Sequence, residues 1–120
     1  MVKDVEWVGP SLDDLKAFPN DVQSDVGFAL YQAQCGKRHP DAKPLKGFGG
    51  ATTLEIVTNY DGDTYRTVYT VRLETAVYVL HAFQKKSTRG VTTPRRDMDL
   101  IRARLAEAVA MDAERAARQQ

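Results

Sequence analysis

The pattern of apolar and polar positions changes period several times along the chain, and each change marks an expected element. Near the start, Val5, Trp7 and Val8 indicate a short strand that stops at Pro10, since proline cannot donate to a β-ladder. Two helices are expected next. Ser11 suits the N-cap of the first helix, and Pro19 ends it. Asn20 or Asp21 can cap the second helix, whose apolar positions at helical spacing are Val22, Val26, Ala29 or Leu30, and Ala33. The pattern therefore predicts a strand followed by a helical hairpin.

A stretch with two prolines and three glycines, residues 37–53, shows no clean period, and we expect it to be a loop. It is followed by segments rich in β-branched and aromatic residues, which predict three consecutive strands at residues 54–59, 64–73 and 76–83. Asp61-Gly62 suits the tight turn between the first two strands. These segments together predict an antiparallel meander.

The final segment reads as a helix. Thr93 suits an N-cap, and Pro94 is expected at the first helical position. One face carries apolar residues at helical spacing, namely Met98, Ile101, Leu105 and Ala108, and this face is expected to lie on the sheet. The stripe fades beyond Met111, so we expect a frayed end from about residue 113. The order of elements predicts one α+β domain over residues 1–120, with helices packed on an antiparallel sheet.

Composition fits this view and excludes other classes. The chain has 120 residues, of which 42% are hydrophobic and 28% charged, as in an ordinary soluble domain. The longest wholly apolar stretch, residues 76–80, is far shorter than the roughly 20 residues that a membrane-spanning helix needs. Because the first residues show no signal-peptide core, we expect a cytoplasmic protein. The single Cys35 forms no internal disulfide, and with His39 and His81 alone it makes no zinc site, so neither a metal nor a cofactor is expected.

Charge is unevenly distributed along the chain. Residues 1–25 carry two basic and six acidic side chains, whereas residues 81–104 carry seven basic and two acidic ones. A local basic cluster in a chain of net charge +1 indicates either an anionic partner bound at one place or a solvated basic face.

Two strand motifs resemble those of a known protein family. The segment YRTVYTV (residues 65–71), the segment VYVLHAFQKKS (residues 77–87) and the following Thr93-Pro94 resemble the RelE-like toxins of bacterial toxin–antitoxin pairs. The similarity is greatest to their HigB-type, phage-related branch. It extends from the Leu45-Lys46-Gly47 loop through the final helix and includes the order of elements.

The resemblance implies a small endoribonuclease that enters the ribosomal A site, cuts messenger RNA and is held inactive by a helix-turn-helix antitoxin protein. It also implies that Arg66, Lys85 and Lys86 contact the scissile phosphate and that Lys46 binds RNA. We expect further RNA contacts from the surrounding basic residues, which are Arg72, Arg89, Arg95 and Arg96. Unlike the best-known members, this chain has Leu54-Glu55-Ile56 where they carry further lysines.

The residues themselves leave two interpretations of Arg66 open. Strand alternation places Arg66 and Arg72 on one face, with Tyr65 and Tyr69 filling the opposite, packed face. Arg66 is then either a structural residue paired with Glu55 or Glu74, or, beside Lys85 and Lys86, part of a phosphate site, for which guanidinium and ammonium groups are suited.

His81 is a candidate general acid or base, but a lone histidine in an apolar strand is more often a hydrogen-bonded core residue. No convincing Glu/His pair is evident, so the general base stays unassigned and we expect the ribosome to supply the cutting geometry. Two rival functions share the fold: inhibition of DNA gyrase without cleavage, as in the similar ParE toxins, and a phage structural or assembly role.

Overall fold

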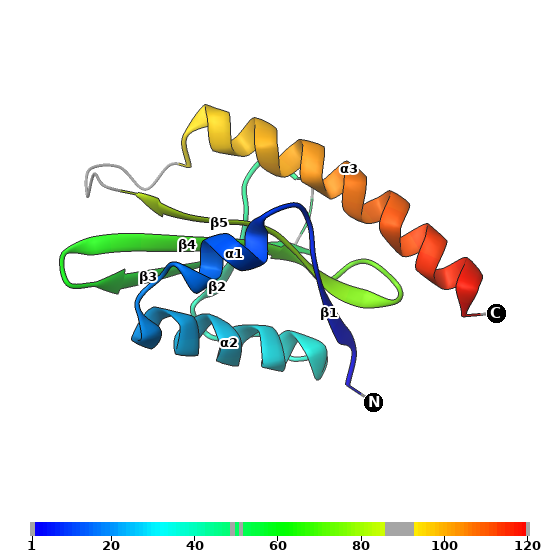
Figure 1. The fold of residues 1–120 in the computed structure, drawn as a ribbon, viewed down its shortest axis with the longest axis horizontal. Coiled ribbons are helices and arrows are strands. Elements are labelled where there is room, and N and C mark those ends of the chain that lie inside the picture. The colour runs from blue at the N-terminus through cyan, green and yellow to red at the C-terminus, as the bar shows by residue number, and fades with distance from the viewer. Residues whose placement is uncertain (1, 49, 51, 86–92, 120) are drawn as a thin grey trace.

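The structure, a computed structural model, describes residues 2–48, 50, 52–85 and 93–119. In these ranges the elements are β1 (Asp4–Trp7), α1 (Ser11–Lys16), α2 (Asn20–Gln34), β2 (Ala42–Pro44), β3 (Thr53–Tyr60), β4 (Asp63–Thr70), β5 (Ala76–Lys85) and α3 (Arg95–Arg118). The strands form one sheet in the order β1-β5-β4-β3-β2, with the long α3 running across it (Figure 1). No helix in the described ranges has the length and apolar character needed to span a membrane.

The predicted meander is confirmed as β3, β4 and β5. Its first turn has positive φ at Asp61 (51°) and Gly62 (83°), which are the angles that an Asp-Gly hairpin turn requires. The sheet extends beyond the meander at both edges. β1 pairs in parallel with the first half of β5, with Asp4 opposite Ala76, so the sheet is mixed and not purely antiparallel.

The loop predicted for residues 37–53 contains a strand, and the prediction is wrong there. β2 pairs antiparallel with β3, with Lys43 opposite Glu55 and Pro44 opposite Leu54. β2 is an edge strand, where proline is tolerated because no further strand needs its missing N–H. Three residues are too few to show a period, so the sequence pattern gave no sign of this strand.

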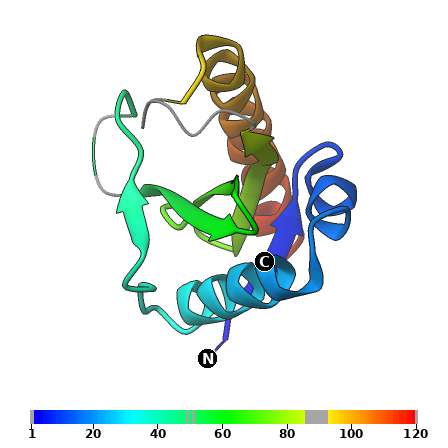
Figure 2. The same cartoon turned by 90° about the vertical axis from the view of Figure 1, so that its left-hand side faces the viewer.

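Helices cover both faces of the sheet (Figure 2). α1 and α2 pack on one face, where Tyr65 and Tyr69 of β4 lie in the core, as predicted. α3 packs on the other face, against a cluster that includes Val68, Tyr78 and Leu80. The expected inward face of α3 is confirmed, since Ile101 and Ala108 are fully buried and the flanking Met98 and Leu105 are partly buried.

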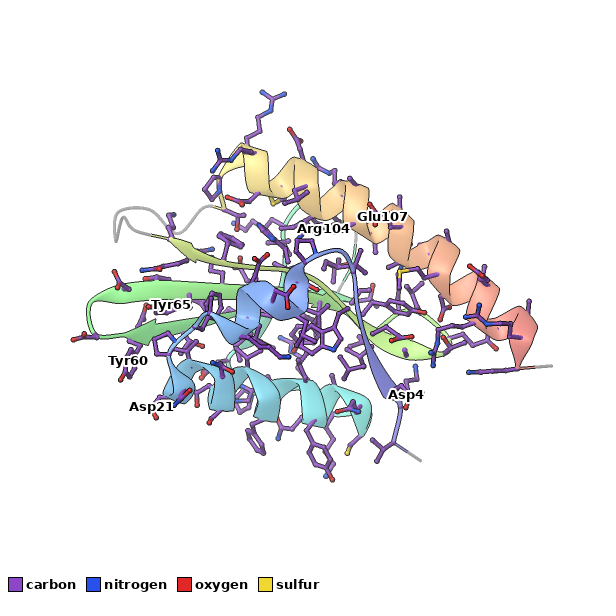
Figure 3. All side chains as sticks on the ribbon, viewed as in Figure 1. Asp4, Asp21, Tyr60, Tyr65, Arg104 and Glu107 are labelled. Atoms are coloured by element: carbon purple, nitrogen blue, oxygen red, sulfur yellow. The ribbon has the colours of Figure 1, made fainter. Side chains whose placement is uncertain are left out.

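The pairing of β4 with β5 shifts by one residue near the middle of the strands. Val68 lies opposite His81 and Tyr69 opposite Val79, which leaves Leu80 without a partner position on β4. In a regular strand, consecutive residues face opposite sides of the sheet. The bulge interrupts this alternation, so both Leu80 and His81 face α3. Arg104 of α3, which Figure 3 shows between helix and sheet, donates to the Leu80 carbonyl at 3.0 Å.

The C-terminal half of α3 is anchored through Asp112 and Arg115. The Asp112 carboxylate accepts hydrogen bonds from the backbone N–H groups of Glu74 and Thr75 and from the hydroxyls of Thr75 and Tyr78. Burial raises the pKa of Asp112, but these hydrogen bonds outweigh it and hold the pKa below the ordinary value of 3.8. Arg115 donates to two carboxylates of β1, Glu6 at 2.6 Å and Asp4 at 3.0 Å. The helix extends to Arg118, and the fraying of its end stays a prediction.

The expected capping hydroxyls do not cap their helices. The N-cap positions of α1, α2 and α3 are occupied by Pro10, Pro19 and Pro94. Ser11 is buried and donates to the Val79 carbonyl at 3.2 Å, while Thr93 bonds within the groove described below. These hydroxyls bond to the sheet because a buried polar group needs a partner there.

Candidate active site

A groove of about 290 Å³ opens on the α3 face of the sheet, between the β2 edge and the start of α3. It is lined by Lys43, Pro44, Leu45, Lys46, Glu55, Thr93 and Met98. Three parts of the chain that are distant in sequence therefore meet here: β2 with the loop after it, β3, and the N-terminal end of α3.

A largely buried ion pair lies at the groove. Both carboxylate oxygens of Glu55 are 3.1 Å from Arg66 Nη1, and the two side chains are 13% and 5% exposed. Thr93 Oγ1 accepts from the same Nη1 at 3.3 Å and donates to Glu55 Oε2 at 3.0 Å. Of the two structural partners considered for Arg66, Glu55 is the one that forms the ion pair. The backbone N–H of Glu74, the other candidate, bonds to Asp112. Arg66 is thus paired as the structural interpretation requires, at the edge of a groove that a ligand can enter.

Lysines border this pair. Lys43 and Lys46 are exposed and line the groove. Lys85 is half-buried at the end of β5, and because Arg66 lies opposite Phe83, Lys85 is its diagonal neighbour on the same face of the sheet. Two further cations are exposed in the first turn of α3, Arg95 and Arg96. The structure therefore brings several predicted RNA-binding residues to one end of the sheet.

Arg72 departs from its predicted position. β4 ends at Thr70, and after it Val71 packs with the α2 cluster while Leu73 packs with the α3 cluster. The strand alternation that predicted a shared face for Arg66 and Arg72 therefore ends before Arg72, which is exposed. The predicted phosphate contact Lys86 and the predicted RNA contact Arg89 lie outside the described residues.

The loop that carries Lys46 is held against α3. Arg102 lies over the Phe48 ring, 5.3 Å from its centroid, and donates to the Gly47 carbonyl at 3.4 Å. Gly47 has φ +94°, and a Cβ at this position would lie 3.0 Å from Arg102 Nη2. The end of the flexible Arg102 side chain could move aside, so it is the positive φ of Gly47 that favours glycine beside Lys46.

His81 lies under α3 and is 7% exposed. Its Nε2 is 2.8 Å from Asp97 Oδ1, its Nδ1 is 3.1 Å from Arg104 Nη1, and its ring stacks on Phe83 at 4.6 Å. Because a guanidinium only donates, Nδ1 accepts from Arg104, and Nε2 carries the proton that is donated to Asp97. Both ring nitrogens are engaged within the protein, as expected for a hydrogen-bonded core histidine.

The groove joins groups that suit a phosphodiester. Guanidinium and ammonium groups stabilise the extra negative charge that a phosphate gains during cleavage, and a carboxylate beside them can accept a proton. The sequence pattern indicated Glu55 only as a structural partner of Arg66 and Thr93 only as a helix cap and part of a motif, and it did not single out Lys43. The sequence feature that could have indicated a site role for Glu55 is its polar side chain between the apolar Leu54 and Ile56, on the strand next to Arg66. In the described part of the chain, no three His, Cys, Asp or Glu side chains are grouped to hold a metal ion.

Comparison with known proteins identifies a family. No curated protein matches the sequence. Among solved structures, a chain of the toxin–antitoxin complex RelBE2 from Mycobacterium tuberculosis is similar, at 22% identity over 72% of this chain and 95% of that chain, with a TM-score of 0.43. The profile of the family described as phage derived protein Gp49-like (DUF891) matches residues 13–106, which include every residue that lines the groove. The chain therefore belongs to the Gp49-like family of phage-derived proteins.

Proposed function

We propose that the protein is the toxin of a type II toxin–antitoxin pair and that it arrests translation by cutting messenger RNA on the ribosome. The observation that carries this proposal is the Arg66–Glu55 pair at a groove bordered by Lys43 and Lys46. The resemblance of the two strand motifs to RelE-like toxins of the HigB type supports the same activity.

In the proposed reaction, the scissile phosphate binds to Arg66 with help from Lys46, Lys85 and Lys86. The phosphate competes with Glu55 for the Arg66 guanidinium, and the released carboxylate takes the proton of the 2′-hydroxyl. The 2′ oxygen then bonds to phosphorus while the bond to the 5′ oxygen breaks, which leaves a 2′,3′-cyclic phosphate. The leaving 5′ oxygen takes a proton from a rim ammonium group, for which Lys46 is the candidate.

The closed ion pair gives a physical reason for dependence on the ribosome. In the free protein both oxygens of Glu55 lie beside Arg66, so a flexible RNA must displace an internal carboxylate before it binds. A strand that the ribosome already holds in shape loses less conformational freedom when it does so, and this favours cleavage.

Cleavage assays test this proposal. Messenger RNA on translating ribosomes is expected to be cut, and naked RNA of the same sequence is expected to stay intact. Glu55→Gln and Lys46→Ala should each lower the rate at least about tenfold, within the usual range for a lost catalytic or positioning group. Lys16→Ala, which removes an exposed lysine from α1, is the matched control and should cut like the wild type. Efficient cutting of naked RNA, or full activity of both groove variants, would contradict the mechanism.

Expression in a bacterium separates the rival functions. Translation arrest without DNA damage is expected for the nuclease, whereas DNA damage with intact messenger RNA would assign a gyrase poison of the ParE type. We further propose a cognate helix-turn-helix antitoxin encoded beside the protein. Co-expression with each neighbouring reading frame should identify one that restores growth and co-purifies, and the absence of any such frame would count against the toxin.

A further inference from the structure

α2 carries aromatic residues on the side turned away from the sheet. Its inward side is buried through Val22, Val26, Ala29, Leu30 and Ala33. Phe28 and Tyr31 nevertheless remain 55% and 54% exposed. Figure 1 shows α2 along the lower edge of the molecule, with its outer side facing away from the sheet. A helix with apolar residues on both sides commonly packs against two neighbours, and the structure supplies one.

The exposed residues form a line along the helix, which we name the outer stripe: Ser24, Phe28, Tyr31 and Cys35. Their spacing of four, three and four residues is the spacing at which side chains of two packed helices interlock. Beside the stripe, Gly27 leaves open space where a Cβ would stand, so another helix can approach closely. The Phe28 ring is held in place by an edge contact with His39, whose centroid is 5.7 Å away.

Charges at the two ends of α2 are opposite. Asp21 and Asp25 are exposed at its N-terminal end, where Figure 3 shows Asp21 on the outer side. Lys37 and Arg38 are exposed just after its C-terminal end. A second α2 laid antiparallel along the first therefore brings the acidic end of each helix to the basic end of the other. The outer stripe is also self-complementary in this arrangement, since it is centred between residues 28 and 31.

We propose that the protein forms a two-fold dimer through the outer stripes of two antiparallel α2 helices. Phe28 of each copy packs on Tyr31 of the other, and Ser24 lies opposite Cys35. A single helix pair buries less than the roughly 1,000 Å² of a stable interface, so the dimer is weak and reversible. The interface lies on the opposite face of the sheet from the groove, so this inference does not depend on the proposed function.

Sedimentation velocity over a range of concentrations tests the interface. The wild type is expected to change from monomer to dimer as its concentration rises, and added salt should weaken the dimer because it screens the end charges. Phe28→Ser and Tyr31→Ser should each weaken dimerisation at least about tenfold, since central aromatic residues dominate interfaces. Leu100→Ser, at a 36% exposed position on α3, is the control and should dimerise like the wild type.

A cross-link tests the register. Ser24→Cys places a new thiol opposite Cys35 of the second copy, so mild oxidation should give a disulfide-linked dimer. Within one chain the two positions are about 16 Å apart along the helix, which is too far for a bridge, and so are two Cys35 thiols across the two-fold axis. The wild type and the double variant Ser24→Cys with Cys35→Ser should therefore stay unlinked. Ala103→Cys, at an exposed position of α3, is the control for disulfides that form through random collision.

Two results would overturn the proposal. One is a protein that stays monomeric at every concentration. If the Phe28→Ser variant of such a monomer also fails to bind a co-expressed antitoxin, the outer stripe would be the antitoxin's binding surface instead. The other is a Ser24→Cys variant that cross-links no faster than Ala103→Cys.

Discussion

At the scale of single residues, the Arg66–Glu55 pair has both a structural and a proposed catalytic role. Arg66 is 4% exposed, and its positive charge is balanced by Glu55. Replacing Arg66 with alanine leaves a carboxylate in a poorly solvated position without its cation, and we expect a loss of about 3–5 kcal/mol in the free energy of unfolding. Urea denaturation measures this loss.

The double variant Arg66→Met with Glu55→Gln removes both charges together and should recover most of the lost stability. An Arg66→Ala protein as stable as the wild type would show that the pair contributes nothing to the fold. Since Arg66→Ala is expected to be destabilised, the loss of activity in that variant alone does not identify a catalytic group. Glu55→Gln has the same difficulty, because it leaves the buried Arg66 cation without its carboxylate. The exposed Lys46→Ala reports on the chemistry more directly.

At the scale of elements, the packing of α3 makes a matched comparison possible. Ile101 is fully buried against the sheet, whereas its neighbour Leu100 is 36% exposed. Ile101→Ala should cost about 2–5 kcal/mol in the free energy of unfolding because it leaves a cavity. Leu100→Ala should cost less than about 1 kcal/mol, since its side chain keeps much of its contact with water. Chemical denaturation of both variants measures the difference, and equal losses would contradict the observed orientation of α3.

Asp112 links the anchoring of α3 to pH. Its pKa is lowered in the folded protein, so the folded state holds this carboxylate charged more firmly than the unfolded chain does. Its contribution to stability is therefore complete above the unfolded value near 3.8 and is lost as pH falls through the lower folded pKa. Asp112→Asn should lower stability at neutral pH by about 1–3 kcal/mol, because an amide nitrogen would face a backbone donor. It should also reduce the loss of stability below pH 4, and an unchanged acid profile would contradict this assignment.

Elements with a long pattern were predictable from sequence, whereas contacts between distant elements were not. The meander, the Asp61-Gly62 turn and the inward face of α3 followed from period and turn chemistry. The β2 strand is too short for a period, and the parallel pairing of β1 with β5 leaves no local signal. The Arg66–Glu55 pair was available as one of two alternatives, but only the register of β3 on β4 selects it. Buried Arg104 and Asp112 were missed, because charged residues on a helix normally indicate its solvent side.

At the scale of the whole molecule, the groove and the outer stripe lie on opposite faces of the sheet, so we expect their variants to act separately. Phe28→Ser should lose dimerisation but keep the wild-type rate of messenger RNA cleavage per chain. Lys46→Ala should show the reverse. Cleavage assays and sedimentation of the same preparations measure both properties, and a Phe28→Ser protein without cleavage activity would mean that the two surfaces are coupled.

The parallel pairing of β1 with β5 also has a consequence for how the chain folds. β1 meets its partner strand about 70 residues further along the chain, and Arg115 of α3 binds β1 as well. Pairings this distant close large loops, so they form late and slow the folding rate. During synthesis β1 therefore cannot pair until β5 has left the ribosome, and the groove cannot form until Thr93 has followed. A nascent chain consequently has no complete groove until the start of α3, which carries Met98, has emerged.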